Sequence, residues 1–173
     1  MSRTKNSQPF MRAEAAMKQK RHQEAIELFL KEPATLAQNW KAMWNLGWCY
    51  YHLGEFSEAG KYFDSADAAS GDAACKWATG LVYLKEKNYK KAELILTESL
   101  QLKERFATHV TLALAYLTQG KVEDAEKVHL DGIKLGTRLS ERYACYVGFL
   151  SDVGRDTEAE GMNRKVRELR AVQ

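Results

Sequence analysis

The residue types that most often carry chemistry in proteins are few in this sequence, and they are scattered. Cysteine occurs at Cys49, Cys75 and Cys145, and His52 follows Cys49 by three residues. Two side chains three apart on a helix could both touch a metal ion, but a zinc site needs one or two further ligands, and none is placed nearby. We therefore expect no metal site, with Cys49 as small buried filler and His52 partly exposed.

Motifs that build catalytic sites are also missing from the sequence. It contains no glycine-rich phosphate loop, no His-Glu-x-x-His, no Cys-x-x-Cys and no nucleophile motif of the hydrolase type. His129 lies on an otherwise apolar helical stripe, where a core histidine bonded to backbone is more common than a ligand or a switch. We therefore expect no catalytic residues, no cofactor and no enzymatic activity.

The charges are distributed unevenly over the 173 residues. Residues 1–24 carry six Lys or Arg against two acids, residues 164–173 carry four against one, and the residues between carry sixteen against twenty. A nucleic-acid-binding protein concentrates its basic residues along one face of the body. The body of this chain is slightly acidic, so we do not expect nucleic acid to be its partner.

The compartment is predicted from what the sequence lacks. No apolar run of signal-peptide length follows the first residues, and no segment approaches the ~20 apolar residues of a membrane span. Three scattered cysteines do not form a disulfide framework, so reduced thiols and a cytoplasmic location are expected. Residues 1–7 have no apolar periodicity and are expected to pack against nothing.

A repeat of 33 to 34 residues organises the chain. An alanine marks each copy, and between Gly47 and Ala59 the spacing of small residue, aromatic and turn glycine is clearest, with Tyr50, Gly54 and Phe56. This pattern resembles the tetratricopeptide repeat. The alanines that set the register are Ala25, Ala59, Ala92, Ala125 and Ala159.

The resemblance implies an all-α fold, a right-handed superhelix (α-solenoid) of about five antiparallel helix-turn-helix repeats in a single domain. Within a repeat, Gly47 and Ala59 are expected to meet where two helices cross closely, and Gly54 to form the turn. Pro33 is expected to stop the second helix of the first repeat, and polar residues on the last helix predict that the array ends there. The predicted repeats span about residues 6–39, 40–72, 73–105, 106–139 and 140–173.

The resemblance also implies where a partner binds, because in this family the first helices of the repeats line a concave groove. Members that hold the acidic C-termini of chaperones use lysine, asparagine and arginine there, whereas this chain has mainly apolar side chains. Such a groove fits an amphipathic helix or an extended hydrophobic segment. The residues predicted to line it are Phe10, Trp44, Trp48, Tyr51, Trp77, Leu81, Leu84, Val110, Leu114 and Leu117.

These observations predict a non-enzymatic module, an adaptor or a chaperone, that binds a protein or peptide. Three alternatives stay open: a secretion-type chaperone for an exported client, a scaffold that assembles into a homo-oligomer, and an accessory protein associated with nucleic acid. The tryptophan stripe has a second interpretation as well. Trp40, Trp44 and Trp48 are spaced by four, which is also the pattern of a buried helix face.

Overall fold

The computed structural model describes residues 8–136 and 138–171, and these form eleven α-helices. The prediction made for residues 1–7 lies outside the described residues. By its internal contacts the chain divides into two compact units, residues 1–88 and 89–173. The boundary falls inside the third predicted repeat, so the single domain expected from the sequence stays a prediction.

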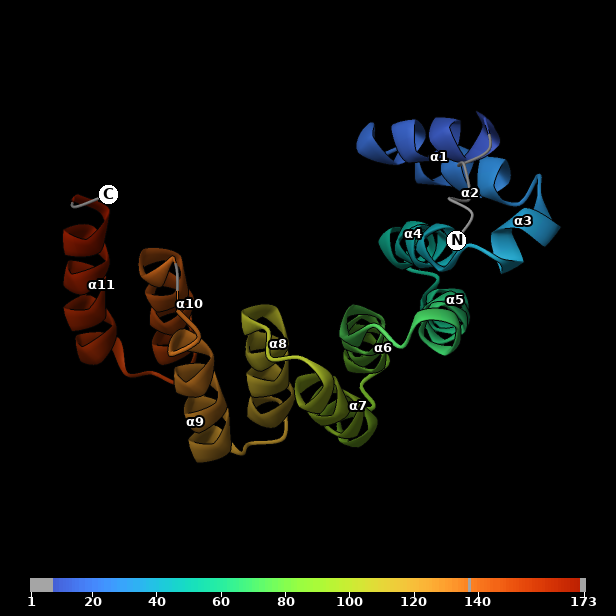
Figure 1. Cartoon of the computed structure of the whole chain (residues 1–173). Coiled ribbons are helices and arrows are strands. Elements are labelled where there is room, and N and C mark those ends of the chain that lie inside the picture. The colour runs from blue at the N-terminus through green and yellow to red at the C-terminus, as the bar shows by residue number, and fades with distance from the viewer. Residues whose placement is uncertain (1–7, 137, 172–173) are drawn as a thin grey trace. The chain divides into compact units, whose positions relative to one another are not determined.

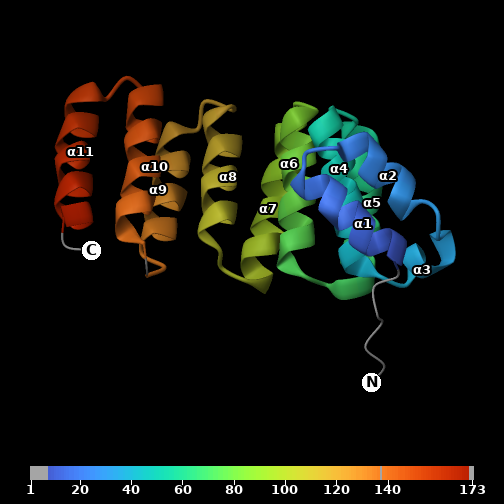
Figure 2. The same cartoon turned by 90° about the horizontal axis from the view of Figure 1, so that it is seen from above.

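The first unit contains six helices, coloured blue to green in Figure 1. Consecutive helices pack side by side, α1 against α2, α4 against α5 and α5 against α6 (Figure 1; Figure 2). The short α3 begins with Pro33, so Pro33 starts a helix, whereas the sequence predicted only that it would stop one. The helices are α1 (Gln8–Lys18), α2 (His22–Phe29), α3 (Pro33–Ala37), α4 (Trp40–Leu53), α5 (Phe56–Ser70) and α6 (Ala73–Lys85).

The helix starts in this unit follow from capping residues. The side chain of Asn39 accepts a hydrogen bond from the Ala42 N–H at 3.1 Å at the start of α4. Asp72 does the same for α6, accepting from the Ala74 N–H at 2.8 Å. Both caps satisfy donors that the first turn of a helix leaves open.

The five turns inside the predicted repeats each contain a residue with a left-handed, positive φ. Gly54 ends α4 with φ 83°, a left-handed value that costs a residue with a Cβ about 1–2 kcal/mol but costs glycine little. Lys87, which replaces the glycine in the third repeat, has φ 60° all the same. The equivalent turn positions are Lys20, Gly54, Lys87, Gly120 and Gly154, and all have positive φ.

The core of the first unit depends on close contacts between small and aromatic residues. Gly47 and Ala59 are buried, as the repeat pattern predicts, but the side chain closest to Gly47 is Phe63. A Cβ added at Gly47 would lie 2.6 Å from Phe63 Cε1. Glycine is therefore required at this position by the phenylalanine ring on the neighbouring helix.

The second unit contains five helices, from α7 to the red α11 in Figure 1. Helix α8 packs against α7 and α9, and α10 packs against α9 and α11. Tyr146, Phe149 and Leu150 of α10 form much of its core. The helices are α7 (Tyr89–Leu102), α8 (Phe106–Leu117), α9 (Val122–Ile133), α10 (Leu139–Asp152) and α11 (Asp156–Ala171).

Two equivalent ion pairs join successive repeats in the second unit. Glu93 accepts from Lys121 Nζ at 2.8 Å, and Glu126 accepts from Arg155 at 2.6 Å. Both acids follow a register alanine directly, and both bases follow a turn glycine directly. Each base holds the pKa of its partner carboxyl below the usual range. These pairs were not predicted from the sequence, although the repeat register contains the signal for them.

Candidate functional site

The predicted groove residues of the first unit lie on α4 and α6. Trp44, Trp48 and Tyr51 follow one another by four and three residues and so share one face of α4. Trp77, Leu81 and Leu84 have the same spacing on α6. All six side chains are partly exposed, with none fully buried. We call these six residues the aromatic face.

The centre of the aromatic face is Trp48. Its ring lies 5.6 Å from the ring of Trp44 and 5.3 Å from that of Tyr51, both in edge-to-face geometry. The ring of Trp77 lies 5.8 Å away, which brings α6 into the same cluster. Edge-to-face aromatic pairs are favoured by the ring quadrupoles and fix ring orientations. The cluster is therefore a rigid surface.

The depth of these side chains differs between the two helices. Trp44, Trp48 and Tyr51 pack against a core cluster that contains Phe63, and the rings of Trp48 and Phe63 are 5.3 Å apart. Burial also raises the pKa of the Tyr51 hydroxyl. These three side chains thus belong partly to the core. The three apolar side chains of α6 belong to no core cluster of the described residues.

Two polar atoms of the aromatic face are buried without a partner. The indole N–H groups of Trp44 and Trp48 reach no hydrogen-bond acceptor among the described residues. A buried donor without an acceptor costs about 1–3 kcal/mol. Phenylalanine or leucine at these positions would fill the same space without burying an unpaired N–H group. Core packing is therefore not a sufficient reason for tryptophan at both positions.

Phe10, also predicted to line the groove, lies in the core instead, and this part of the prediction is wrong. Its side chain is 0% exposed, and its ring is 5.6 Å from that of Phe29. Ala13 and Ala16, which lie beside it on α1, are also buried. Their small side chains leave space between α1 and α2, and Phe10 fills it.

The remaining predicted residues lie on α8, in the second unit. Val110, Leu114 and Leu117 share one face by their spacing, and Leu117 packs against the core of that unit. Leu114 is 48% exposed, which is unusual for a large apolar side chain in a helix with a buried neighbour on each side. This face of α8 is a second, smaller apolar surface.

Cys49 and His52, the two residues considered for metal binding from the sequence, lie in different surroundings. Cys49 is fully buried, and burial raises the pKa of its thiol to about 12, which makes it a poor nucleophile and ligand. His52 is exposed and stacks on His22 of α2, with 4.7 Å between ring centroids. Across residues 8–136 and 138–171, no three metal-binding side chains gather in one place.

No helix among the described residues is both long and apolar enough to cross a bilayer. The two other cysteines differ in their surroundings: burial raises the pKa of the Cys75 thiol to about 11, whereas Cys145 is exposed.

The aromatic face contains only apolar and aromatic side chains, so the chemistry available on it is that of apolar and aromatic contact.

Known proteins resemble this chain in one segment of sequence and in fold. Residues 11–74 match the tetratricopeptide repeat family. No curated protein matches the sequence. Among solved structures, MamA 41-end from Desulfovibrio magneticus RS-1 is 18% identical with TM-score 0.71, covering 93% of this chain and 92% of that one.

Two further structures give the same result. A tetratricopeptide repeat protein from Parabacteroides merdae is 18% identical with TM-score 0.79, covering 92% of this chain and 63% of that one. An array of nearly identical TPR-like repeats from Podosopora anserina is 18% identical with TM-score 0.75, covering 94% and 93%. At these identities the likeness shows the fold. Residues 11–74 are therefore similar in sequence to tetratricopeptide repeats, and the described residues have the all-helical fold of tetratricopeptide-repeat proteins.

Proposed function

We propose that this chain is a protein-binding adaptor that holds an apolar segment of another protein against the aromatic face, and that it is not an enzyme. The observation that carries the proposal is the state of the α6 side chains. Trp77, Leu81 and Leu84 are partly exposed and serve no core cluster of the described residues.

The types of residue on this face support a binding role. Tryptophan and tyrosine are enriched among residues that dominate binding energy, because they bury a large area with few rotatable bonds. The ring contacts around Trp48 hold these side chains in place before a partner arrives. A surface that is already ordered loses less entropy on binding.

The chemistry of the face also restricts the class of partner. None of its six residues carries a charge, so it offers no clamp for a free carboxylate. An amphipathic helix or an extended apolar segment can instead bury its side chains between those of α4 and α6.

The test begins with a random-peptide library selected against the full chain. We expect the recovered peptides to share an apolar pattern with helical or alternating spacing. The double variant Trp77→Ala, Leu84→Ala should weaken their binding about 30-fold, because truncating one hot-spot residue costs ~2 kcal/mol or more. Isothermal titration calorimetry measures this affinity, and circular dichroism should show an unchanged helical content.

A matched control removes two other apolar side chains of the chain. Leu94 and Leu102 on α7 are 59% and 55% exposed and lie outside the aromatic face. The variant Leu94→Ala, Leu102→Ala should bind the selected peptides as the parent does. Equal weakening by both variants, or full binding by the α6 variant, would remove the aromatic face as the binding site.

A further inference from the structure

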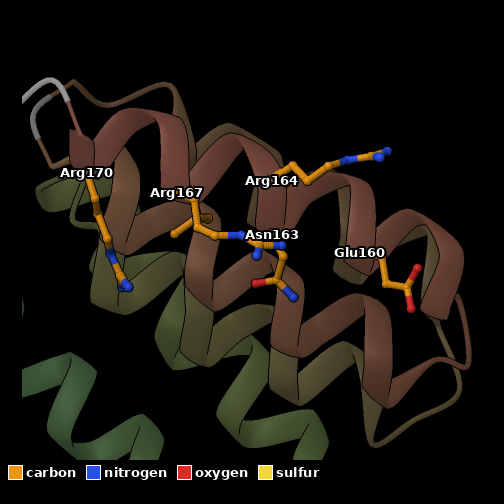
Figure 3. Close-up of a pocket in the computed structure, with 6 residues that line it drawn as sticks. Glu160, Asn163, Arg164, Arg167 and Arg170 are labelled. Carbon is orange, nitrogen blue, oxygen red and sulfur yellow. The ribbon is translucent and has the colours of Figure 1, made fainter.

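The outward face of α11 carries a row of polar side chains that no described residue covers. Figure 3 shows five of them projecting from this helix, and together with Val166 they line a shallow hollow. Three are arginines, each exposed and without an ion pair among the described residues. The five are Glu160, Asn163, Arg164, Arg167 and Arg170.

The repeat register shows what this face does elsewhere in the chain. Ala59 of α5 and Ala159 of α11 occupy the same position, so the two helices correspond residue by residue. In α5 this face receives α6: Asp64 accepts a hydrogen bond from Thr79 at 3.0 Å, and Asp67 pairs with Lys76 at 3.2 Å. The corresponding residues of α11 are Arg164 and Arg167.

The ends of the face correspond in the same way. Ser70 of α5 lies 3.7 Å from the Cys75 sulfur of α6, and its equivalent in α11 is Arg170. Gly60 of α5 lies close to Val82 of α6, because a Cβ added at Gly60 would be 3.5 Å from Val82 Cγ1. The residue of α11 equivalent to Gly60 is Glu160. The exposed face of α11 thus corresponds to the face of α5 on which α6 docks. At its centre, the two aspartates of α5 are replaced by Arg164 and Arg167.

From this exchange we propose that the α11 face binds an acidic helix of a partner protein, docked as α6 docks on α5. The occupant carries Asp or Glu at the positions of Lys76 and Thr79, three residues apart, where they face Arg167 and Arg164. A third acid at the position of Cys75 faces Arg170. Guanidinium groups suit this role because they pair with carboxylates through two parallel hydrogen bonds.

The surroundings of the arginines favour an acidic helix over nucleic acid. The basic part of the face spans residues 164–170, roughly 9 Å along the helix axis at 1.5 Å per residue. The same face carries an acid, Glu160, one turn before Arg164. A phosphate backbone that followed the helix would meet Glu160, whereas a short cluster of two or three carboxylates fits the basic part alone.

The site is separate from the aromatic face, and its test uses a defined probe. The probe is a fluorescent, alanine- and leucine-based helical peptide of about 20 residues, roughly 30 Å long, with glutamates at the three positions named above. The control peptide has glutamine at those positions. Fluorescence anisotropy with the full chain at low ionic strength should show binding of the glutamate peptide only.

Variants of the protein test the same contacts from the side of α11. Arg164→Gln, Arg167→Gln, Arg170→Gln should weaken the glutamate peptide about tenfold, because exposed charge pairs each contribute modestly. The triple variant Lys90→Gln, Lys103→Gln, Lys127→Gln removes the same charge from exposed lysines elsewhere in the second unit and should bind normally. The single variant Arg167→Glu should bind a peptide with lysine at the facing position better than the glutamate peptide.

Four results would overturn the proposal. They are a parent chain that binds neither peptide, equal binding of both peptides, equal loss in the arginine and lysine variants, and binding of a DNA duplex that depends on the arginines while the glutamate peptide does not bind. The arginines are exposed, so circular dichroism should show that the triple variant is folded. The glutamine peptide tests the same contacts on the parent chain, independently of that variant.

Discussion

His129 shows how one residue can carry a measurable property of the whole chain. It occupies the position of Phe63 in the second repeat and of Leu96 in the third, and it is 3% exposed. Its ring contacts those of Tyr146 and Phe149, and its Nε2 atom has no hydrogen-bond partner among the described residues. Burial, with a smaller effect of His109, lowers the pKa of His129 to about 4.

The folded chain should therefore lose stability as the pH falls below the pKa of an unfolded histidine. Between pH 6.5 and 4 the unfolded chain binds a proton at this residue that the folded chain does not. From pH 7 to pH 5 the loss is on the order of 2 kcal/mol, at 1.36 kcal/mol per pH unit. Urea unfolding at both pH values measures it, with His129→Phe as the variant that cannot take up the proton.

The parent and His129→Phe should thus differ in the slope of unfolding free energy against pH. Other groups, including His22, titrate alike in both proteins and cancel in the comparison. Parallel slopes would show that His129 is solvated or bonded in the folded state, contrary to the packing described above.

At the residue scale, the sequence predicted which helix face a side chain occupies but not how deep it lies. The α4 and α6 members of the predicted groove share faces as expected, because helical spacing alone determines this. Phe10 has the same spacing and is buried. How deeply a side chain is buried depends on side chains of other helices. Phe29 packs against Phe10, and Phe63 packs against Trp48. These contacts cannot be predicted from the spacing of residues within one helix.

At the scale of helices, the all-helical repeat fold predicted from the register is confirmed. Its strongest local mark is the shared turn conformation, which persists at Lys20 and Lys87 where glycine is replaced. The helix α3 was not predicted, because proline both ends and starts helices and the sequence does not distinguish the two. The polar face of α11 was noticed in the sequence but was interpreted as the end of the array, because its correspondence with the face of α5 that receives α6 depends on contacts that only the structure displays.

Two glycines inside helices should respond oppositely to alanine. Gly47→Ala places a methyl group 2.6 Å from Phe63, so we expect a loss of about 1–3 kcal/mol in unfolding free energy. Gly148→Ala on α10 meets nothing within 4 Å and should stabilise the chain by roughly 0.5–1 kcal/mol, because alanine favours helix. Thermal and urea unfolding of the two variants check the signs. A stabilising Gly47→Ala would show that the contact with Phe63 is not as described.

At the scale of the whole molecule, the two terminal helices both present basic outer faces. The exposed face of α1 includes Arg12 and Lys18, and its large apolar side chain is Met11. The face of α11 has three exposed arginines that form no ion pair with any residue that the structure describes. Like charges repel across a contact, and one exposed methionine buries too little area to offset this.

We therefore predict that the exposed face of α1 in one copy of the chain does not bind the exposed face of α11 in another. Sedimentation velocity over a wide range of protein concentration measures the mass of the protein. A dimer that survives dilution and whose stability changes in the variant Arg167→Glu would contradict the prediction, because reversing one charge alters a contact that includes α11.

The common conformation at Lys20, Gly54, Lys87, Gly120 and Gly154 has a consequence for how such a chain changes in evolution. Recombination between any two of these codons removes or duplicates whole repeats and joins backbone positions that both have a left-handed φ. The new junction then requires no local refolding. The number of repeats can for this reason change while each turn keeps its backbone conformation.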